Sequence, residues 1–408
     1  MVNRSLKATT IALVAGALVL AGGSTAAAGD GPSTTRSSDR SAIVKLVRDA
    51  MRESHLNSVI VKVSEGDEIL IKRAFGQSMT GVPATTDMHF RNGAVAIGYM
   101  ANVLLQLVDD GTVSLDDKVS RWLPEIPHTD RVTLGQLARM TSGYPDYVRE
   151  PAFDQANLEN PFKQWTPQGQ LAFVVDQPLY YEPGTNWNYS HTNYVILGLA
   201  LEKITGMPLS RLLRTRVLEP LGLDQTRSSQ TASVPSPVLH AFTAERREYL
   251  GVPDGSPFLE ESTFWNPSWT LARGSVQTTD IDDVHASAIA FGTGELLSRQ
   301  SYRAMISTDL RGFGGPVEGC GFSCFTQNVA YSYGIGLVTS GNWVLQNPMF
   351  AGTAAVAAYL PSDDIAIAVA VTYQEAAFAD GGPANEADAL FRQIGALLAP
   401  KDAPPTRG

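Results

Sequence analysis

The chain has 408 residues, of which 44% are hydrophobic and 18% are charged. This is the composition of a globular protein with enough apolar side chains for a large core in one or two domains. The formal net charge of −10 argues against nucleic acid or an anionic membrane as a partner, because both need a basic face.

The N-terminus has the parts of a secretory signal peptide. Arg4 and Lys7 precede an apolar run at 11–21, and small residues follow as far as Ala28. The run is shorter than the about 20 residues that span a bilayer, and Gly23 stands where a lipid-carrying cysteine would be needed. We therefore expect a signal peptide at 1–28, cleavage near Ala28 and a secreted protein without a stable membrane anchor. An uncleaved N-terminal anchor is the alternative.

A leader, a helix and a hairpin are expected to follow. The stretch 29–37 is rich in Gly, Ser, Thr and Pro, which predicts a disordered leader. Ser38 or Asp39 can cap a helix, because apolar residues recur at three- and four-residue spacing over 43–51. Two β-branched runs then flank Glu65-Gly66-Asp67 and predict a hairpin.

The middle of the chain is predicted to be mainly helical. One helix is expected to begin near Ala94 and to stop at Gly111. Strand patterns return only towards the C-terminus, at 333–337, 356–360 and 365–370. A closing helix at 385–398 precedes a Pro-rich tail, 399–408, that we expect to be disordered.

Strands at both ends of the chain predict an α/β fold, an α+β sandwich with one shared sheet. This antiparallel central sheet is expected to be built from residues near 58–76 and 333–372. The α/β part would comprise 38–111 and 266–398, with 112–265 as an inserted, mainly helical region. The sequence has no internal repeat and no dinucleotide- or phosphate-binding glycine motif, so no cofactor is expected.

Several long segments occur in an order seen in a known superfamily. They are FRNGAVAIGYMANVLLQLVD (90–109), GTVSLDDKVSRWLPEIP (111–127), VTLGQLARMTSGYPDY (132–147), PGTNWNYSHTNYVILGLALEKITG (183–206) and the stretch 268–283. The chain thereby resembles the serine β-lactamase and D,D-peptidase superfamily, in the branch of class C β-lactamases, D-alanyl-D-alanine carboxypeptidases and related esterases. The resemblance implies a β-lactamase/transpeptidase-like domain over 38–398, with an antiparallel sheet flanked by helices.

The first catalytic motif of that superfamily is missing. Its members carry Ser-x-x-Lys, which places the nucleophile and its base on one face of a helix. Here the motif reads Ala94-Val95-Ala96-Ile97, and neither Ala94 nor Ile97 can attack a carbonyl or accept a proton. No serine occurs between Ser78 and Ser114, so a displaced copy of the motif is excluded.

The second motif, Tyr-x-Asn, reads Tyr189-Ser190-His191. The resemblance makes the phenol of Tyr189 an acid/base partner or a hydrogen-bonding wall of the pocket. An imidazole at His191 can act as a general acid or base near neutral pH. The alternative is a wall histidine held by a structural hydrogen bond.

The third motif, His-x-Gly or Lys-Thr-Gly, is expected near Gln346-Asn347-Pro348, where no cation is available. Pro348 cannot donate a backbone hydrogen bond to a substrate or a neighbouring strand. The edge of the strand that pairs with substrate in this superfamily is therefore also altered.

The two cysteines of the chain, Cys320 and Cys324, are closely spaced in GCGFSC. In an exported protein this spacing favours a small disulfide loop. A metal site is not expected, because no histidine lies within 30 residues of the pair.

Three functional hypotheses follow. The first is a pseudoenzyme that binds a small molecule, or a protein partner, in the former active-site cleft. The second is an enzyme of another class, such as an isomerase, cyclase or lyase, with Tyr189 and His191 as candidate catalytic residues. The third is a residual esterase or peptidase with a relocated nucleophile. The expected lining of the cleft is Ala94, Ile97, Tyr189, His191, Gln346 and Asn347, which favours a largely neutral ligand.

Overall fold

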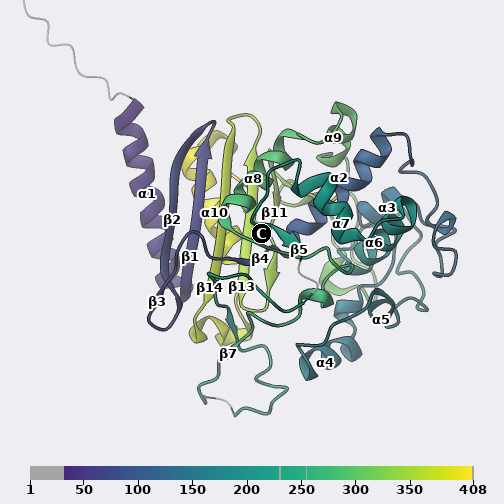
Figure 1. The fold of residues 1–408 in the computed structure, drawn as a ribbon, viewed down its shortest axis with the longest axis horizontal. Coiled ribbons are helices and arrows are strands. Elements are labelled where there is room, and N and C mark those ends of the chain that lie inside the picture. The colour runs from purple at the N-terminus through teal and green to yellow at the C-terminus, as the bar shows by residue number, and fades with distance from the viewer. Residues whose placement is uncertain (1–31, 229–230, 254, 407–408) are drawn as a thin grey trace, which may run out of the picture.

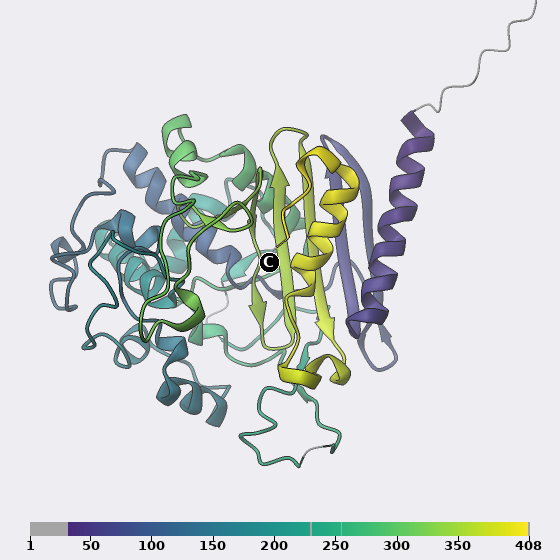
Figure 2. The same ribbon diagram turned by 180° about the vertical axis from the view of Figure 1, so that it is seen from behind.

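A large antiparallel sheet forms the centre of the protein (Figure 1). The structure, a computed structural model, describes residues 32–228, 231–253 and 255–406, so the predicted signal peptide lies outside the described residues. Helices α1 (Pro32–Glu53) and α10 (Glu386–Leu398) pack on one face of this sheet, and α8 (Ile281–Thr293) packs on the other. The view from behind shows α1 and α10 side by side over the strands (Figure 2).

The sheet joins both ends of the chain, as predicted. Its strands follow the order β3-β2-β1-β14-β13-β11-β10-β9, with β12 paired to β13. Val59 of β1 lies opposite Val371 of β14, so the two terminal parts of the chain form one core. The strands are β1 (Leu56–Glu65), β2 (Glu68–Met79), β3 (Val82–Pro83), β9 (Ser332–Tyr333), β10 (Val338–Ser340), β11 (Trp343–Gln346), β12 (Met349–Phe350), β13 (Thr353–Leu360) and β14 (Ile365–Tyr373).

The regular secondary structure of the region from 112 to 265 is mainly helical where the structure describes it (Figure 1). Its helices are α3 (Leu134–Ala138), α4 (Pro151–Glu159), α5 (Pro167–Leu171), α6 (His191–Thr205) and α7 (Leu209–Leu213). Short strands β4 (Phe90–Arg91), β5 (Arg227–Ser228) and β8 (Gln277–Thr279) form a small sheet, and β6 (Phe242–Thr243) pairs with β7 (Glu260–Glu261). Helix α2 (Val95–Asp109) contacts α6, α7 and α9 (Arg299–Met305).

The predicted disordered leader, 29–37, was wrong over residues 32–37, because α1 begins at Pro32 rather than at Ser38 or Asp39. Proline is tolerated in the first turn of a helix, where its missing N–H needs no partner. Further along α1, Arg40 Nε donates a hydrogen bond of 2.6 Å to the carbonyl of Leu70, which ties the helix to the hairpin.

The tail was also predicted incorrectly, because residues after 398 pack on the domain. The indole of Trp343 donates to the carbonyl of Asp402 at 2.7 Å, and Arg392 donates to the carbonyl of Pro405. These contacts give the backbone of a Pro-rich segment fixed partners, which its composition alone does not reveal.

The strand expected at 333–337 is interrupted. Strand β9 ends at Tyr333 and β10 begins at Val338. Between them Gly336 has φ +71, and a Cβ atom there would lie 2.3 Å from the Cβ of Ala101. The chain therefore turns sharply where it passes α2, and only glycine fits this close approach.

Candidate functional site

A cavity of about 220 Å³ lies between the start of α2, the start of α6 and the end of β11. It contains every residue that the sequence predicted to line the cleft, namely Ala94, Ile97, Tyr189, His191, Gln346 and Asn347. The rest of its lining is mostly apolar or aromatic and includes Trp269, Leu271, Val338, Pro348, Met349 and Phe350. No residue with a fixed charge lines the cavity in the described part of the chain.

The α2 wall of the cavity has no group that could replace the missing nucleophile. Ala94 is the N-cap of α2 and Ile97 lies one turn further on, so a methyl group and an aliphatic side chain face the cavity. Nearby polar side chains are engaged elsewhere. The amide of Asn92 donates to Gln277 Oε1 at 2.5 Å, and the hydroxyl of Tyr99 lies 2.6 Å from that of Ser287.

Pro348 packs directly against the start of α2. A Cβ atom at Gly93, where φ is +49, would lie 2.6 Å from Pro348 Cβ, so a glycine is required at this position. The two predicted amides next to Pro348 have structural partners. Gln346 Nε2 donates to the carbonyl of Gly336 at 2.6 Å, and Asn347 Nδ2 donates to Asp388 Oδ1 at 3.0 Å. The side-chain NH2 groups at this edge of the cavity are therefore engaged in structural contacts.

The α6 wall, in contrast, carries an ordered polar pair. His191 is the first residue of α6, and its Nδ1 lies 3.1 Å from Oδ2 of Asp146 and 3.2 Å from Oδ1. The same carboxylate accepts from the backbone N–H of His191 at 3.1 Å and from that of Val148 at 3.3 Å. Asp146 is only 2% exposed, so these contacts hold the imidazole from a buried, rigid position.

This contact sets which nitrogen of His191 can act on a ligand. An ionised carboxylate only accepts hydrogen bonds, so the neutral imidazole carries its proton on Nδ1. Nε2 then has a lone pair on the ring edge opposite Asp146, and the ring lines the cavity. The arrangement can accept a hydrogen bond from a ligand, or a proton from a reacting group.

Tyr189 completes this wall as a neutral phenol. Burial raises the pKa of Tyr189 well above its ordinary value, so the hydroxyl keeps its proton at physiological pH. Its ring lies edge-on to that of His191, with centroids 5.4 Å apart. A ligand in the cavity would therefore meet a donor at Tyr189 and an acceptor at His191.

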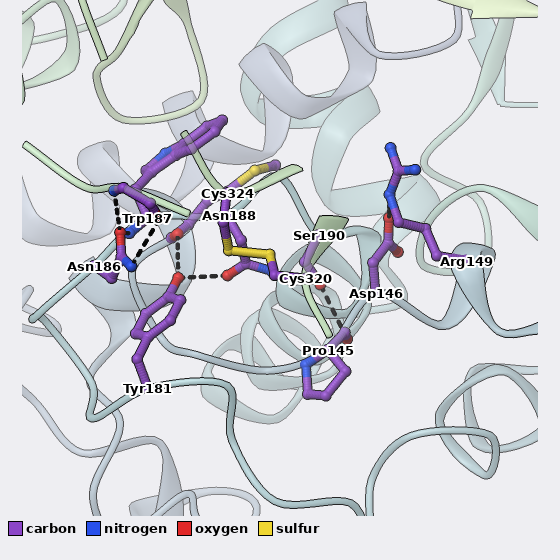
Figure 3. The surroundings of a disulfide bond; sticks show 12 residues. Pro145, Asp146, Arg149, Tyr181, Asn186, Trp187, Asn188, Ser190, Cys320 and Cys324 are labelled. Atoms are coloured by element: carbon purple, nitrogen blue, oxygen red, sulfur yellow. Dashed lines mark hydrogen bonds and ion pairs between the residues drawn. A yellow bond between two sulfur atoms is a disulfide. The ribbon is translucent and has the colours of Figure 1, made fainter. Parts of the chain in front are cut away.

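Asp146 was missed by the sequence analysis. It lies within the segment 132–147 that carries the resemblance, but its partner His191 is 45 positions away. Only the fold brings them together, through hydrogen bonds from Ser190 and Thr192 to the carbonyl of Pro145. Figure 3 shows Ser190 against Pro145, with Asp146 and Arg149 beside them.

The predicted disulfide between Cys320 and Cys324 is present and lies beside the site (Figure 3). The backbone N–H of Tyr189 donates at 3.3 Å to the carbonyl of Ser323, inside the disulfide loop. The loop therefore helps to position the Tyr189 wall.

Within residues 32–228, 231–253 and 255–406, no group of three or more His, Cys, Asp or Glu side chains is arranged to hold a metal ion. No helix of that part is both long enough and apolar enough to span a membrane.

Comparison with known proteins places these features in a family. The family model named Beta-lactamase matches residues 43–391. The chain is 32% identical over 183 residues to penicillin-binding protein 4* of Bacillus subtilis, covering 44% of this chain and 40% of that protein. It is 26% identical over 204 residues to a putative D-alanyl-D-alanine carboxypeptidase of Salmonella paratyphi B, covering 46% and 45%. The matching part thus spans less than half the length of these relatives.

Solved structures agree in fold. A D-stereospecific amidohydrolase from a Streptomyces species has a TM-score of 0.66 at 23% identity, covering 84% of this chain and 96% of its own. The D-amino acid amidase of Ochrobactrum anthropi SV3, in complex with L-phenylalanine amide, has a TM-score of 0.71 at 21% identity, covering 89% and 99%. At these identities the likeness shows the fold alone. With a family model that matches most of its length, the chain belongs to the Beta-lactamase family.

Proposed function

We propose that this protein is a secreted, non-hydrolytic member of the family that binds a small, largely neutral and partly apolar molecule in the cavity. One observation carries the proposal: Ala94 and Ile97 present only hydrocarbon where the related enzymes need a hydroxyl and an amine. Removing the nucleophile of a catalytic unit costs about a millionfold in rate.

The chemistry of the cavity supports a neutral ligand. A carboxylate would have no cation to bind among the described lining residues, and a buried unpaired charge is strongly disfavoured. Apolar contacts with Trp269 and Phe350, whose rings stack with centroids 5.5 Å apart, suit a flat apolar group. Tyr189 and His191 would orient a polar group at the other end of the ligand.

A second candidate function is supported by the contact between Asp146 and His191. A carboxylate that holds Nδ1–H leaves Nε2 as a base, and the neutral phenol of Tyr189 supplies an acid. Such a pair could move a proton on a bound substrate in an isomerase, cyclase or lyase reaction. This chemistry needs no acyl-enzyme intermediate and is compatible with Ala94.

Covalent probes test the absence of hydrolysis. The purified protein is incubated with a fluorescent penicillin and with a fluorophosphonate, and its intact mass is measured. We expect no adduct and no turnover of a chromogenic cephalosporin or of short acyl esters. A stoichiometric acyl adduct on a residue of the cavity would overturn the proposal.

A neutral probe tests binding and separates it from catalysis. N-Acetylphenylalanine amide, as each enantiomer, is titrated by calorimetry, and the recovered compound is analysed by mass spectrometry and chiral chromatography. If the cavity only binds, Tyr189→Phe and His191→Ala should each weaken affinity by about tenfold, the loss of one hydrogen bond. If the pair is catalytic, a chemical change in the probe should disappear in both variants while the melting temperature stays nearly constant. Binding that is unchanged in both variants would show that the cavity is not the site.

Mass spectrometry of the protein from culture medium tests secretion. We expect a mature chain that begins at or near Gly29 and is two hydrogens lighter than the reduced form. An intact N-terminus that stays with the cell would count against export.

A further inference from the structure

A second hollow adjoins the cavity. It is a groove of about 700 Å³, and Tyr189 and Tyr331 line both the groove and the cavity. Its other lining residues are Arg149, Trp187, Phe322, Ser323, Phe325, Thr326, Asn328 and Ala330. Half of its lining is thus aromatic, and the two tyrosines form a wall that the cavity and the groove share.

Phe322 is exposed to solvent at the edge of this groove. Its side chain is 80% exposed, more than any other large hydrophobic residue in the described ranges. It stands inside the loop closed by Cys320 and Cys324, and the guanidinium carbon of Arg149 lies 3.7 Å from its ring centroid. A short cross-linked loop and a cation–π contact fix an exposed ring in one place, which lowers the entropy lost when a ligand stacks on it.

Arg149 is the one charged residue among the described residues that line the groove. Its Nε forms an ion pair with Asp146 Oδ2 at 3.9 Å, a distance that is too long for a hydrogen bond. Asp146 already accepts from His191 and Val148. The guanidinium, with its side chain 36% exposed, therefore keeps N–H groups that can bind an anion.

We propose that this groove is a second binding subsite, which takes a planar aromatic group carrying a carboxylate or sulfonate. The proposal rests on the proposed function in one respect: the ligand whose neutral end occupies the cavity extends past Tyr189 and Tyr331. Phe322 and Phe325 stack on the aromatic group, and Arg149 binds the anion. The site as a whole then selects molecules with a neutral apolar end and an aromatic, anionic end.

The test uses 8-anilinonaphthalene-1-sulfonate and its uncharged analogue N-phenyl-1-naphthylamine. Fluorescence titration of the folded protein should show saturable binding of one molecule of either dye. Phe322→Ala should weaken both dyes by about tenfold, because both lose the stacking surface. Arg149→Gln should weaken the sulfonate by about tenfold and the uncharged dye by less than twofold.

Matched control variants are available at residues that do not line the groove. Phe162→Ala removes another exposed ring, 59% exposed, and Arg121→Gln removes a guanidinium that lies 5.1 Å from the ring of Trp122. Neither should change either affinity by more than twofold. Equal effects of the control and groove variants would overturn the subsite, and equal effects of Arg149→Gln on both dyes would overturn the role of the anion.

The proposals for the cavity and for the groove can be tested separately. Ile97→Phe reduces the cavity, and Ile97 does not line the groove. This variant should lose affinity for N-acetylphenylalanine amide and keep its affinity for the dyes. Phe322→Ala should keep the affinity for the amide and lose affinity for the dyes. Dye binding as expected without any amide binding would support the groove and refute the proposed function of the cavity.

Discussion

The two walls of the cavity differ in how their residues are held. On the α2 wall, glycines allow close packing: Gly93 lies under Pro348, and a Cβ at Gly98 would lie 2.6 Å from the ring of Phe291. On the α6 wall, His191 is held by hydrogen bonds to Asp146. The α2 wall packs as part of the hydrophobic core, whereas the α6 wall carries groups that can act on a ligand. The loss of one motif has not removed the polarity of the whole site.

Returning a lysine to the α2 wall should have the largest effect. Ile97 is fully buried, and no carboxylate lines the cavity beside it in the described residues. Ile97→Lys should therefore lower the free energy of unfolding by about 3 kcal/mol, because it buries an unpaired charge. Denaturant unfolding measures this, with Ile97→Met, which conserves volume, as the control. A loss below about 1 kcal/mol would show that this wall is more polar than its residues indicate.

Removing Asp146, which holds His191 on the α6 wall, should have the next largest effect on stability. Asp146→Ala leaves the backbone N–H groups of His191 and Val148 and the imidazole Nδ1–H without their acceptor, and should cost about 2 kcal/mol. Asp146→Asn keeps an oxygen for the backbone but turns an amide donor towards Nδ1.

The Asp146→Asn variant should therefore move the neutral imidazole proton to Nε2 with a smaller loss of stability. Nitrogen-15 chemical shifts of the His191 ring report the tautomer directly. An unchanged tautomer in this variant would show that Asp146 does not set it.

Helix α8, whose Ser287 lies beside Tyr99 of α2, carries two buried titratable groups whose effect on stability can be tested by changing the pH. In α8, burial raises the pKa of Asp283 to about 6 and lowers the pKa of His285 to about 4. The folded state binds the Asp283 proton more tightly than the unfolded state does. The stabilisation that this proton gives to the folded state is therefore lost as the pH rises from about 4 to about 6. The unfolded state binds the His285 proton more tightly, so that contribution grows as pH rises from about 4 to about 6.5.

In the parent protein these two contributions oppose each other. Asp283→Asn should therefore make stability rise with pH between about 4 and 6.5, by on the order of 2 kcal/mol, and His285→Gln should make it fall. Unfolding midpoints in urea at several pH values check the signs. Identical pH profiles for the parent and both variants would contradict the assignment.

The smallest effect is expected at Ala94. Ala94→Ser adds one hydroxyl at a half-buried position that faces the cavity, so stability should change by less than about 0.5 kcal/mol. The variant should still give no adduct with a fluorescent penicillin, since Ile97 cannot take the proton of the new hydroxyl. Acylation of this single variant would show that the α6 wall can activate a nucleophile across the cavity.

Much of the fold was predictable because its signals are local. The hairpin at Glu65-Gly66-Asp67, the helix after Ala94 and the closing helix capped by Asn385 all follow from short patterns and lie where they were expected. Pro32 and Pro405 were misjudged because proline-rich composition suggests disorder, whereas tertiary contacts hold the tail and the hairpin holds α1.

The candidate site was predictable only in part. Ala94, Tyr189 and His191 were placed by motif positions, and the structure brings them to one cavity. Asp146 and the groove at Phe322 depend on contacts between distant segments, which no local spacing encodes. Gln346 and Asn347 line the cavity, but hydrogen bonds to Gly336 and Asp388 direct their amides to structural roles.

The pairing of β1 with β14 also determines when this protein can fold. Ser58 and Thr372, whose hydroxyls lie 2.6 Å apart across the two strands, are 314 positions apart in the chain. The central sheet therefore cannot close until nearly the whole polypeptide has been synthesised, and such distant pairing makes folding slow.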